Sequence, residues 1–239
     1  ILSYNEHVLV FSGSIEGISY KVTFCPSGDA WFWNVALEGS CPQELDVVYG
    51  QDLGVAEDGG VYANELYMSQ YLGHSILEGA FGTVVCSRQN QPCGGCFPYV
   101  QQGTIGIRAA HYSTDGLQFF GLSYRDTNIP DALSHDLADR NLQYEFAYTA
   151  LQTERFVLSG TKEFAFYGIF RKNHPDKISG LEYQEELAEA FKAVQTRIAA
   201  ADPLHTSSVQ RSTQFGAPFC SADFTEEEVA AYYPNRMLE

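Results

Sequence analysis

Residues 18–37 show a regular alternation of apolar and polar positions, in two runs separated by Pro26-Ser27-Gly28-Asp29. A period of two is typical of strands with one buried face, and the tetrapeptide is rich in turn-forming residues, so the stretch predicts a β-hairpin. Pairing Cys25 with Ala30 gathers the apolar side chains on one face. That face carries Ile18, Tyr20, Val22, Phe24, Trp31, Trp33, Val35 and Leu37. Both tryptophans of the chain therefore belong to it.

A second hairpin is predicted over residues 104–125, with its turn at residues 113–116. Pairing Tyr112 with Leu117 places eight side chains on one face: Ile105, Ile107, Ala109, His111, Gln118, Phe120, Leu122 and Tyr124. Shorter strands are predicted at residues 7–11, 44–49, 81–86, 142–151, 155–158 and 163–170. A series of roughly eight or nine short strands is typical of an antiparallel barrel or sandwich, and we expect a barrel of about eight strands.

Helical periodicity is clearest late in the chain. Over residues 183–200 the apolar side chains Leu187, Phe191, Val194 and Ile198 share one stripe, and Pro203 follows. A capping box at residues 225–228 predicts a short terminal helix, and residues 61–77 are expected to be helical as well. We therefore expect a single mainly β domain over residues 1–239, in which a helical extension, residues 175–239, packs on a β-rich part, residues 1–174.

The charge excludes some partners. With 30 acidic and 14 basic side chains the net charge is -16, and such a field repels nucleic acid and anionic lipid. No apolar run approaches the roughly 18 residues that span a bilayer, so we predict no membrane insertion. The acidic residues Asp46, Asp52, Glu57 and Asp58 predict a solvated loop, because their spacing does not fit an EF-hand calcium loop.

Six cysteines form an even set: Cys25, Cys41, Cys86, Cys93, Cys96 and Cys220. An even set in an acidic, lysine-poor chain favours disulfides and a secreted or other oxidising compartment. Two other hypotheses concern Cys93-Gly94-Gly95-Cys96, namely a thiol oxidoreductase site, or zinc held with Cys86 and either Cys220 or His111. Structural disulfides are favoured over both, so we predict no metal and no cofactor.

No hydrolase, zincin or nucleotide-binding motif occurs, so whether the chain is an enzyme stays open and no catalytic residue is assigned. The apolar faces predict a secreted or lumenal binding protein for a small apolar or aromatic ligand, although a role as core is favoured for the aromatic rings themselves and some rings can serve both roles. The predicted ligand-binding residues are Trp31, Trp33, Tyr20, His111, Phe120 and Tyr124. One alternative is a polysaccharide- or glycoside-active enzyme with an open aromatic cleft, using two carboxylates or His111 with Tyr124. Another is an interaction or effector protein with a filled barrel.

Overall fold

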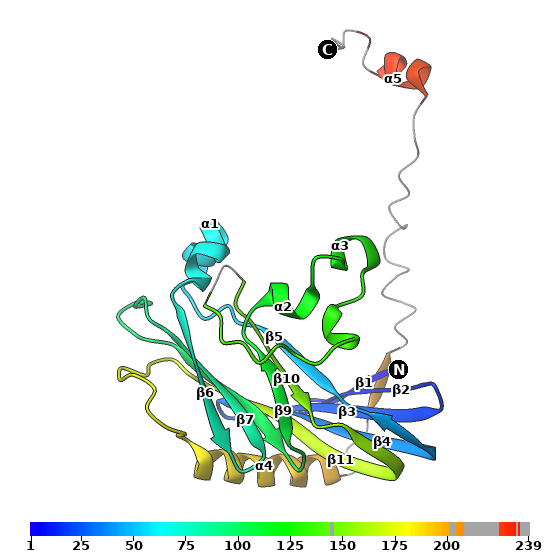
Figure 1. The fold of residues 1–239 in the computed structure, drawn as a ribbon, viewed down its shortest axis with the longest axis vertical. Coiled ribbons are helices and arrows are strands. Elements are labelled where there is room, and N and C mark those ends of the chain that lie inside the picture. Colours follow the sequence, from blue (N-terminus) through cyan, green and yellow to red (C-terminus); the bar gives the residue numbers. More distant parts are fainter. Residues whose placement is uncertain (144–145, 201–203, 208–224, 233, 235–239) are drawn as a thin grey trace.

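A computed structural model describes residues 1–143, 146–200, 204–207, 225–232 and 234, and the fold is mainly β, as predicted. Its centre is one large mixed 12-stranded sheet with few helices (Figure 1). The strands are β1 (Leu2–Tyr4), β2 (Leu9–Ile15), β3 (Ile18–Ser27), β4 (Ala30–Leu45), β5 (Val48–Asp52), β6 (Leu72–Gly79), β7 (Gly82–Gln89), β8 (Tyr99–Ile105), β9 (Ala109–Ser113), β10 (Tyr148–Thr153), β11 (Phe156–Arg171) and β12 (His205–Ser207).

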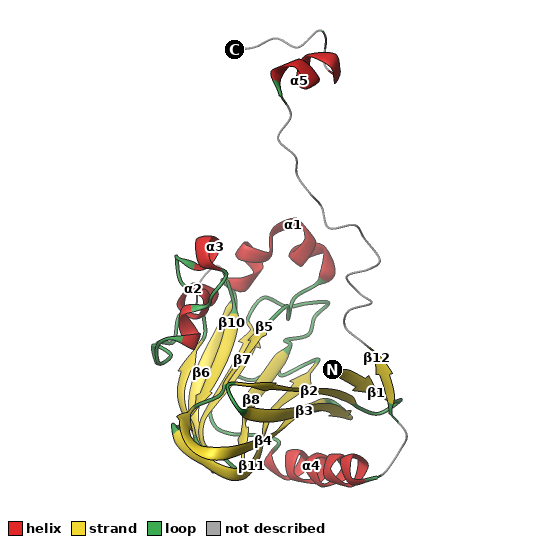
Figure 2. Cartoon of the chain, turned by 90° about the vertical axis from the view of Figure 1, so that its right-hand side faces the viewer, coloured by secondary structure: helices red, strands yellow, loops and turns green. Residues whose placement is uncertain are grey.

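The predicted barrel is wrong, because the sheet does not close. Its order is β12-β1-β2-β3-β4-β11-β8-β7-β9-β10-β5, with β6 paired to β7 at the side. The sheet instead folds over on itself: Figure 2 shows β5, β7 and β10 upright, while β2 and β3 lie crosswise to them. Strands β4 and β11 have 16 residues each and pair along almost their whole length, and strands of that length twist enough to turn the sheet.

The main core lies between the two halves of the folded sheet. Val35, Leu37 and Phe166 from β4 and β11 pack there against Leu151 of β10 and Ala109 of β9. We call the face that carries these residues the inner face of the sheet. Some of the aromatic side chains expected to line a barrel, among them Tyr20 and Trp33, therefore lie between two halves of one open sheet.

The first hairpin is confirmed in its location and in its two faces, while its register is wrong by two residues. Ser27 pairs with Ala30 and Phe24 with Trp33, so only Gly28 and Asp29 form the turn. Gly28 has φ +60°, a conformation that glycine adopts without strain. Because side chains alternate with a period of two, a shift of two residues leaves every side chain on its predicted face.

The second predicted hairpin is wrong. After β9 the chain forms two short helices, α2 (Gly116–Phe120) and α3 (Tyr124–Thr127), followed by a 3₁₀ turn, η1 (Asp131–Leu133). The carboxylate of Asp115 accepts hydrogen bonds from the backbone N–H groups of Leu117 (3.0 Å) and Gln118 (3.3 Å). Asp115 is thus the N-cap of α2. Aspartate is common both in turns and at helix N-caps, so the sequence pattern alone predicts a turn here.

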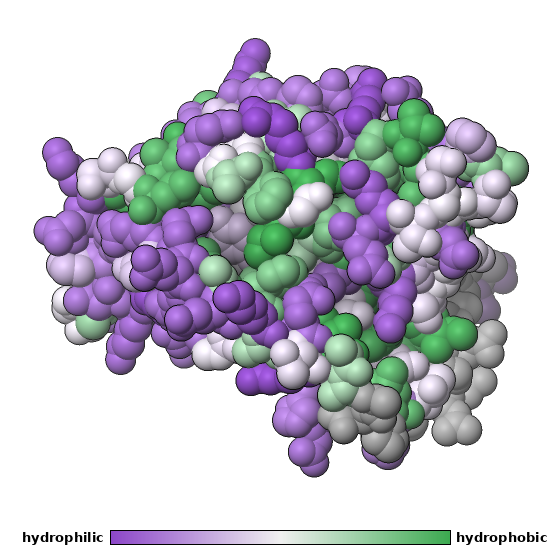
Figure 3. Space-filling view, turned by 90° about the horizontal axis from the view of Figure 1, so that it is seen from below, coloured by the Kyte–Doolittle hydropathy of each residue, from purple (hydrophilic) through white to green (hydrophobic). Residues whose placement is uncertain are grey.

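Helix α4 (Gln184–Ala199) confirms the predicted late helix and covers the outer face of the sheet. Leu187 and Val194 pack there against Cys25, Phe32 and Ile169. Figure 3 views the molecule from the side of α4, where hydrophobic patches lie between hydrophilic side chains. Helix α1 (Asp58–Ser69) covers only the first part of the predicted helix 61–77, and β6 takes over from Leu72.

The terminal helix α5 (Glu226–Tyr232) begins with the predicted capping box. The backbone N–H of Glu228 donates to Thr225 Oγ1 (3.3 Å), and that of Thr225 donates to Glu228 Oε2 (2.9 Å). A capping box needs only residues within one turn of each other, so the sequence pattern is enough to predict it.

The predicted disulfides are wrong for the described cysteines, all of which are free thiols: Cys25, Cys41, Cys86, Cys93 and Cys96. Cys25 is buried under α4, Cys86 is buried beside Tyr99, and Cys41 is exposed on β4. The even number of cysteines therefore does not indicate disulfides, because the fold places Cys25, Cys41 and Cys86 in separate surroundings. Cys220 lies outside the described residues, and the compartment stays a prediction. Among the described helices, none is long and apolar enough to cross a membrane.

Candidate functional site

Both tryptophans line a hollow where β3 and β4 meet the edge strand β5. Its volume is about 290 Å³, and its lining is Phe24, Trp31, Trp33, Tyr49, Gly50 and Gln51. We call this site the aromatic hollow. It joins residues from the two halves of the folded sheet, which are adjacent here only because the sheet doubles over.

Direct strand pairing sets the orientation of the aromatic rings. Phe24 and Trp33 are cross-strand partners whose ring centroids lie 4.6 Å apart, and Phe11 of β2 lies 6.2 Å from Trp33. Trp31 pairs with Gly168 of β11, and a Cβ atom at Gly168 would lie 2.0 Å from Cζ2 of Trp31. The indole of Trp31 therefore occupies the space that a Cβ atom of residue 168 would need, so only glycine fits at this position.

A chain of hydrogen bonds connects the aromatic hollow to the interior. Trp31 Nε1 donates to Tyr49 Oη (3.3 Å), and the Tyr49 hydroxyl donates to Gln51 Oε1. Gln102 Nε2 also donates to Gln51 Oε1 (2.9 Å), and Thr149 Oγ1 donates to Gln102 Oε1 (2.5 Å). Burial raises the pKa of Tyr49, so its hydroxyl stays neutral and remains a donor. The network holds Gln51 in one orientation.

The chemistry of the aromatic hollow is suited to binding. None of its six lining residues carries a charge, and none has a carboxyl or imidazole group. Its one ionisable group, the Tyr49 hydroxyl, has a raised pKa and already donates its proton to Gln51. Aromatic faces combined with a few fixed polar groups are typical of small-molecule sites. Such a site fits a neutral ligand that has one apolar face and a polar edge.

Other cavities offer less defined chemistry. A groove of about 490 Å³ lies between α4 and the sheet, with Lys21, Glu163 and Phe191 in its lining. A second one, of about 300 Å³, lies between α4 and the β6–β7 hairpin and also includes Phe191. Both follow the seam between a helix and the sheet that it covers. The first has two aromatic side chains in its lining and the second has three, whereas the aromatic hollow has four, including both tryptophans.

Phe120 and Tyr124, two of the predicted site residues, lie in a separate aromatic cluster. Phe120 packs on Tyr124 (centroids 4.8 Å) and on Tyr148 of β10 (5.0 Å). Val48 of β5 packs with this cluster, whereas its neighbour Tyr49 stacks on Phe166 of the main core, with the ring centroids 5.2 Å apart. Successive residues of a strand face opposite ways, so the cluster and the aromatic hollow lie on opposite faces of β5.

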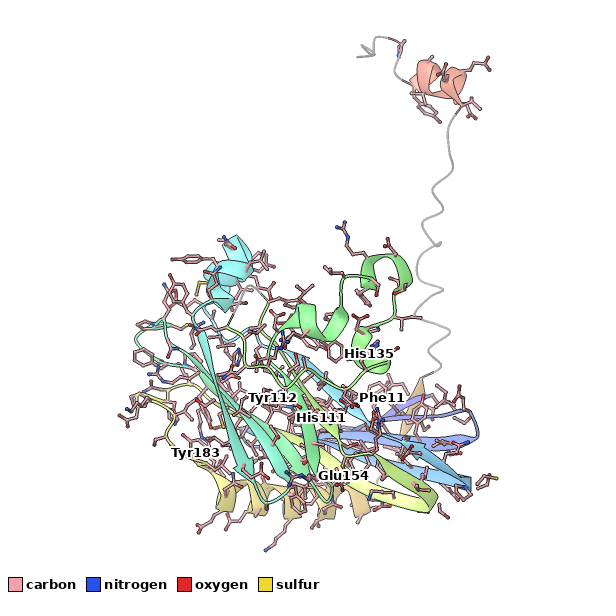
Figure 4. All side chains as sticks on the ribbon, in the orientation of Figure 1. Phe11, His111, Tyr112, His135, Glu154 and Tyr183 are labelled. Atoms are coloured by element: carbon pink, nitrogen blue, oxygen red, sulfur yellow. The ribbon has the colours of Figure 1, made fainter. Side chains whose placement is uncertain are left out.

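His111 and Tyr20 have structural partners of their own. His111 Nδ1 lies 2.7 Å from Asp139 Oδ2, and the backbone N–H of Tyr112 donates to the other oxygen of that carboxylate (2.9 Å). Figure 4 shows His111 and Tyr112 on β9. Tyr20 packs against the main core, and its ring lies against Gly13 of β2. The proposed joint action of His111 and Tyr124 assumed one strand face, and Tyr124 is not on a strand.

Metal chemistry finds no support in the described part of the chain, where no three His, Cys, Asp or Glu side chains group as ligands. Cys93 and Cys96 face each other across Gly94-Gly95, each donating its backbone N–H to the other's carbonyl oxygen (2.8 and 3.0 Å). The tetrapeptide is thus a tight hairpin turn, and Glu57 accepts a hydrogen bond from its Gly94 N–H.

Sequence reasoning missed Tyr49 and Gln51. A single short strand is predicted at residues 44–49, but Leu45 ends β4 and Val48 begins β5, whose neighbour in the sheet is β10. The local sequence pattern does not predict the pairing of β5 with β10, so the contact of Tyr49 with Trp31 could be found only in the structure.

Comparison with known proteins gives two sequence matches. The family described as "SOGP N-terminal domain" matches residues 1–168. A 1,2-beta-oligoglucan phosphorylase of Listeria innocua serovar 6a is 34% identical over 239 residues, which is 100% of this chain and 21% of that protein. The chain thus spans about a fifth of the length of this relative.

A solved structure described as "Putative kojibiose phosphorylase from human microbiome" aligns with 80% of this chain and 20% of its own, at 10% identity and a TM-score of 0.36. The two sequence matches overturn the prediction of a binding protein for a small apolar or aromatic ligand. They favour the alternative of a glycoside-active protein. The error arose because flat aromatic faces suit apolar ligands and sugar rings alike.

Proposed function

Since the chain belongs to the SOGP N-terminal domain family, we propose that it is the N-terminal domain of a glycoside phosphorylase that acts on 1,2-β-linked oligoglucans. One observation carries the proposal, namely the 34% identity with an oligoglucan phosphorylase over all 239 residues. The match extends beyond residue 168, where the family match ends.

Phosphorolysis makes demands that this chain meets only in part. Phosphate attacks the anomeric carbon while the glycosidic C–O bond breaks, and the leaving oxygen takes up a proton. The step needs a general acid and cationic or N–H donors around phosphate. A net charge of -16 works against holding phosphate, and the aromatic hollow has no carboxyl or imidazole group that could serve as the acid. We therefore assign bond breaking to another part of a longer protein, and contact with neutral glycan to this domain.

A product assay tests the proposal. The complete gene product that contains this chain is incubated with a 1,2-β-linked oligoglucan, with and without inorganic phosphate, and the products are resolved by chromatography. We expect a glucosyl 1-phosphate and a chain one unit shorter, only when phosphate is present. A 1,4-β-linked oligoglucan is the matched control for linkage.

Two results would count against the proposal. If no oligoglucan gives a sugar phosphate, the assigned activity is wrong. If the 239-residue chain alone forms the sugar phosphate, the activity stands but the division of labour is wrong, because the acid and the phosphate site must then lie in this chain.

A further inference from the structure

We propose that the aromatic hollow is a binding subsite for a glucosyl unit of an oligoglucan chain, away from the bond-breaking step. The identity of the glycan rests on the proposed function above. The geometry independently specifies the ligand class, which is a neutral molecule with an apolar face and a hydroxyl-bearing edge. A pyranose ring has both, since its axial C–H groups form one face and its hydroxyl groups project around the rim.

The aromatic surface extends beyond the hollow. Leu9, Phe24, Trp33 and Phe166 are successive cross-strand partners in β2, β3, β4 and β11, and we call this row the inner strip. At the β2 end the strip is open to solvent, where Leu9 is 38% exposed and the neighbouring Phe11 is 37% exposed. Figure 4 labels Phe11 on β2. A ligand seated in the aromatic hollow can therefore continue along the sheet, which suits a chain of sugar units better than a single one.

Polar groups at the hollow are fixed and available. The carbonyl oxygen of the Gln51 side chain already accepts from Tyr49 and Gln102. Its amide nitrogen has no partner among the described residues, so two N–H donors remain for a ligand. Within the described ranges β5 pairs with β10 alone, which leaves backbone N–H and C=O groups along its other edge. Hydroxyl groups can both donate to and accept from such an arrangement.

The size and charge of the aromatic hollow narrow the ligand further. About 290 Å³ lies just below the roughly 300–1,000 Å³ found for small-molecule sites, so the hollow holds a small unit and not a whole chain. The lining has no cationic side chain, so it offers inorganic phosphate no charge pairing. An aliphatic ligand would leave the Gln51 amide without a partner, which is costly once water is excluded.

Intrinsic fluorescence gives a direct assay, because the chain has only 2 tryptophans and both line the hollow. The 239-residue chain is titrated with 1,2-β-linked oligoglucans of increasing length, and inorganic phosphate is titrated separately. We expect a saturable change in emission with the oligoglucans, with a Kd of about 0.1–1 mM, and none with phosphate.

Variants locate the binding by calorimetry. Trp33→Ala removes the central ring and should weaken binding by at least about tenfold, the range of a lost stacking contact. Gln51→Glu keeps the acceptor oxygen and removes the free N–H donors, so we expect a loss of about fivefold. Phe11→Ala should weaken binding of long chains and leave a disaccharide unaffected. Tyr62→Ala, at a side chain 95% exposed on α1, is the control and should change nothing. Circular dichroism checks folding, and Gln51→Glu keeps the test decisive if Trp33→Ala does not fold.

The outcomes separate this inference from the proposed function. If the gene product phosphorolyses oligoglucan but the emission does not change with any oligoglucan up to about 10 mM, the subsite is wrong and the activity stands. If the chain binds another neutral β-glucan and not the 1,2-linked one, the hollow is a sugar subsite and the linkage assignment fails. In the complete gene product Trp33→Ala should raise KM with little effect on kcat. An unchanged KM would mean that another part of the complete gene product covers the aromatic hollow, and this result overturns the inference.

Discussion

Gly168→Ala tests how the strand pairing positions Trp31. Gly168 lies directly across from Trp31, and an added Cβ would lie 2.0 Å from Cζ2, 2.2 Å from Cε2 and 2.6 Å from Cη2 of the indole. Real Cβ atoms essentially never approach within 3.0 Å, so the ring must move by at least 1.0 Å, the difference between 3.0 and 2.0 Å. The contact involves the rigid ring, which has no flexible end that could turn away.

The cost follows from two effects. Overpacking typically costs about 1–3 kcal/mol. The ring movement also lengthens the 3.3 Å hydrogen bond from Trp31 to Tyr49, which is worth about 1 kcal/mol. Together they predict a free energy of unfolding lower by about 2–4 kcal/mol. For a chain of this length each kcal/mol shifts Tm by about 2–4 °C, so Tm should fall by about 5–15 °C.

Thermal unfolding and tryptophan emission are the measurements. Gly180→Ala is the matched control, because nothing lies within 4 Å of its added Cβ, and it should stay within about 0.5 kcal/mol of the parent. In the double variant Trp31→Ala/Gly168→Ala the clash is gone, so it should be no less stable than Trp31→Ala alone. Gly168→Ala with the Tm and emission of the control, or strictly additive effects in the double variant, would refute the reasoning.

Three further predictions concern single side chains. Asp115→Ala removes the N-cap of α2 and should lower the free energy of unfolding by about 1 kcal/mol in urea titrations. Burial lowers the pKa of His74 from 6.5 to about 4, so as pH falls through that window the unfolded chain binds a proton that the folded chain does not. Stability should therefore drop by up to about 1.4 kcal/mol per pH unit between 6.5 and 4, and His74→Gln should remove this component. Arg171 donates to Asp29 (2.8 Å), pairs with Glu186 and lies 4.4 Å over the ring of Tyr183. Arg171→Ala should therefore lower the free energy of unfolding by about 1–3 kcal/mol, measured by thermal unfolding, and Arg171→Lys should not restore it.

Local patterns were enough where neighbours in sequence make the structure. The hairpin at residues 18–37 follows from alternation around a glycine turn, and α4 follows from an apolar stripe that needs a sheet to cover. The error of two residues in the hairpin register left both faces intact, because sheet faces repeat every second residue. Had the register slipped by one residue, Trp31 and Trp33 would have been placed under α4.

Local patterns failed where two structures suit the same residues. Asp115-Gly116 can begin a turn or cap a helix, and the choice is decided by Phe119, which is buried against Ala150 of β10. The chain around Phe120 alternates in hydrophobicity as a strand would, yet burial of one helix turn against β10 prevails. Tertiary packing thus overrode the local signal at the site where two of the candidate residues lie.

Whether Trp31 and Trp33 fill an interior or line a site depends on contacts that are distant in sequence. Tyr49 reaches Trp31 only because β5 pairs with β10, about 100 residues further along the chain, where Asp52 lies opposite Tyr148. A filled core would bury both indoles completely, but each keeps part of its surface exposed while one ring edge is fixed by packing or by a hydrogen bond. Side chains that are held in place and still accessible are what ligand binding requires, since little rotational freedom remains to be lost when a sugar ring docks. The two tryptophans therefore line the aromatic hollow, and the interior is filled instead by Phe166, Leu151 and their neighbours.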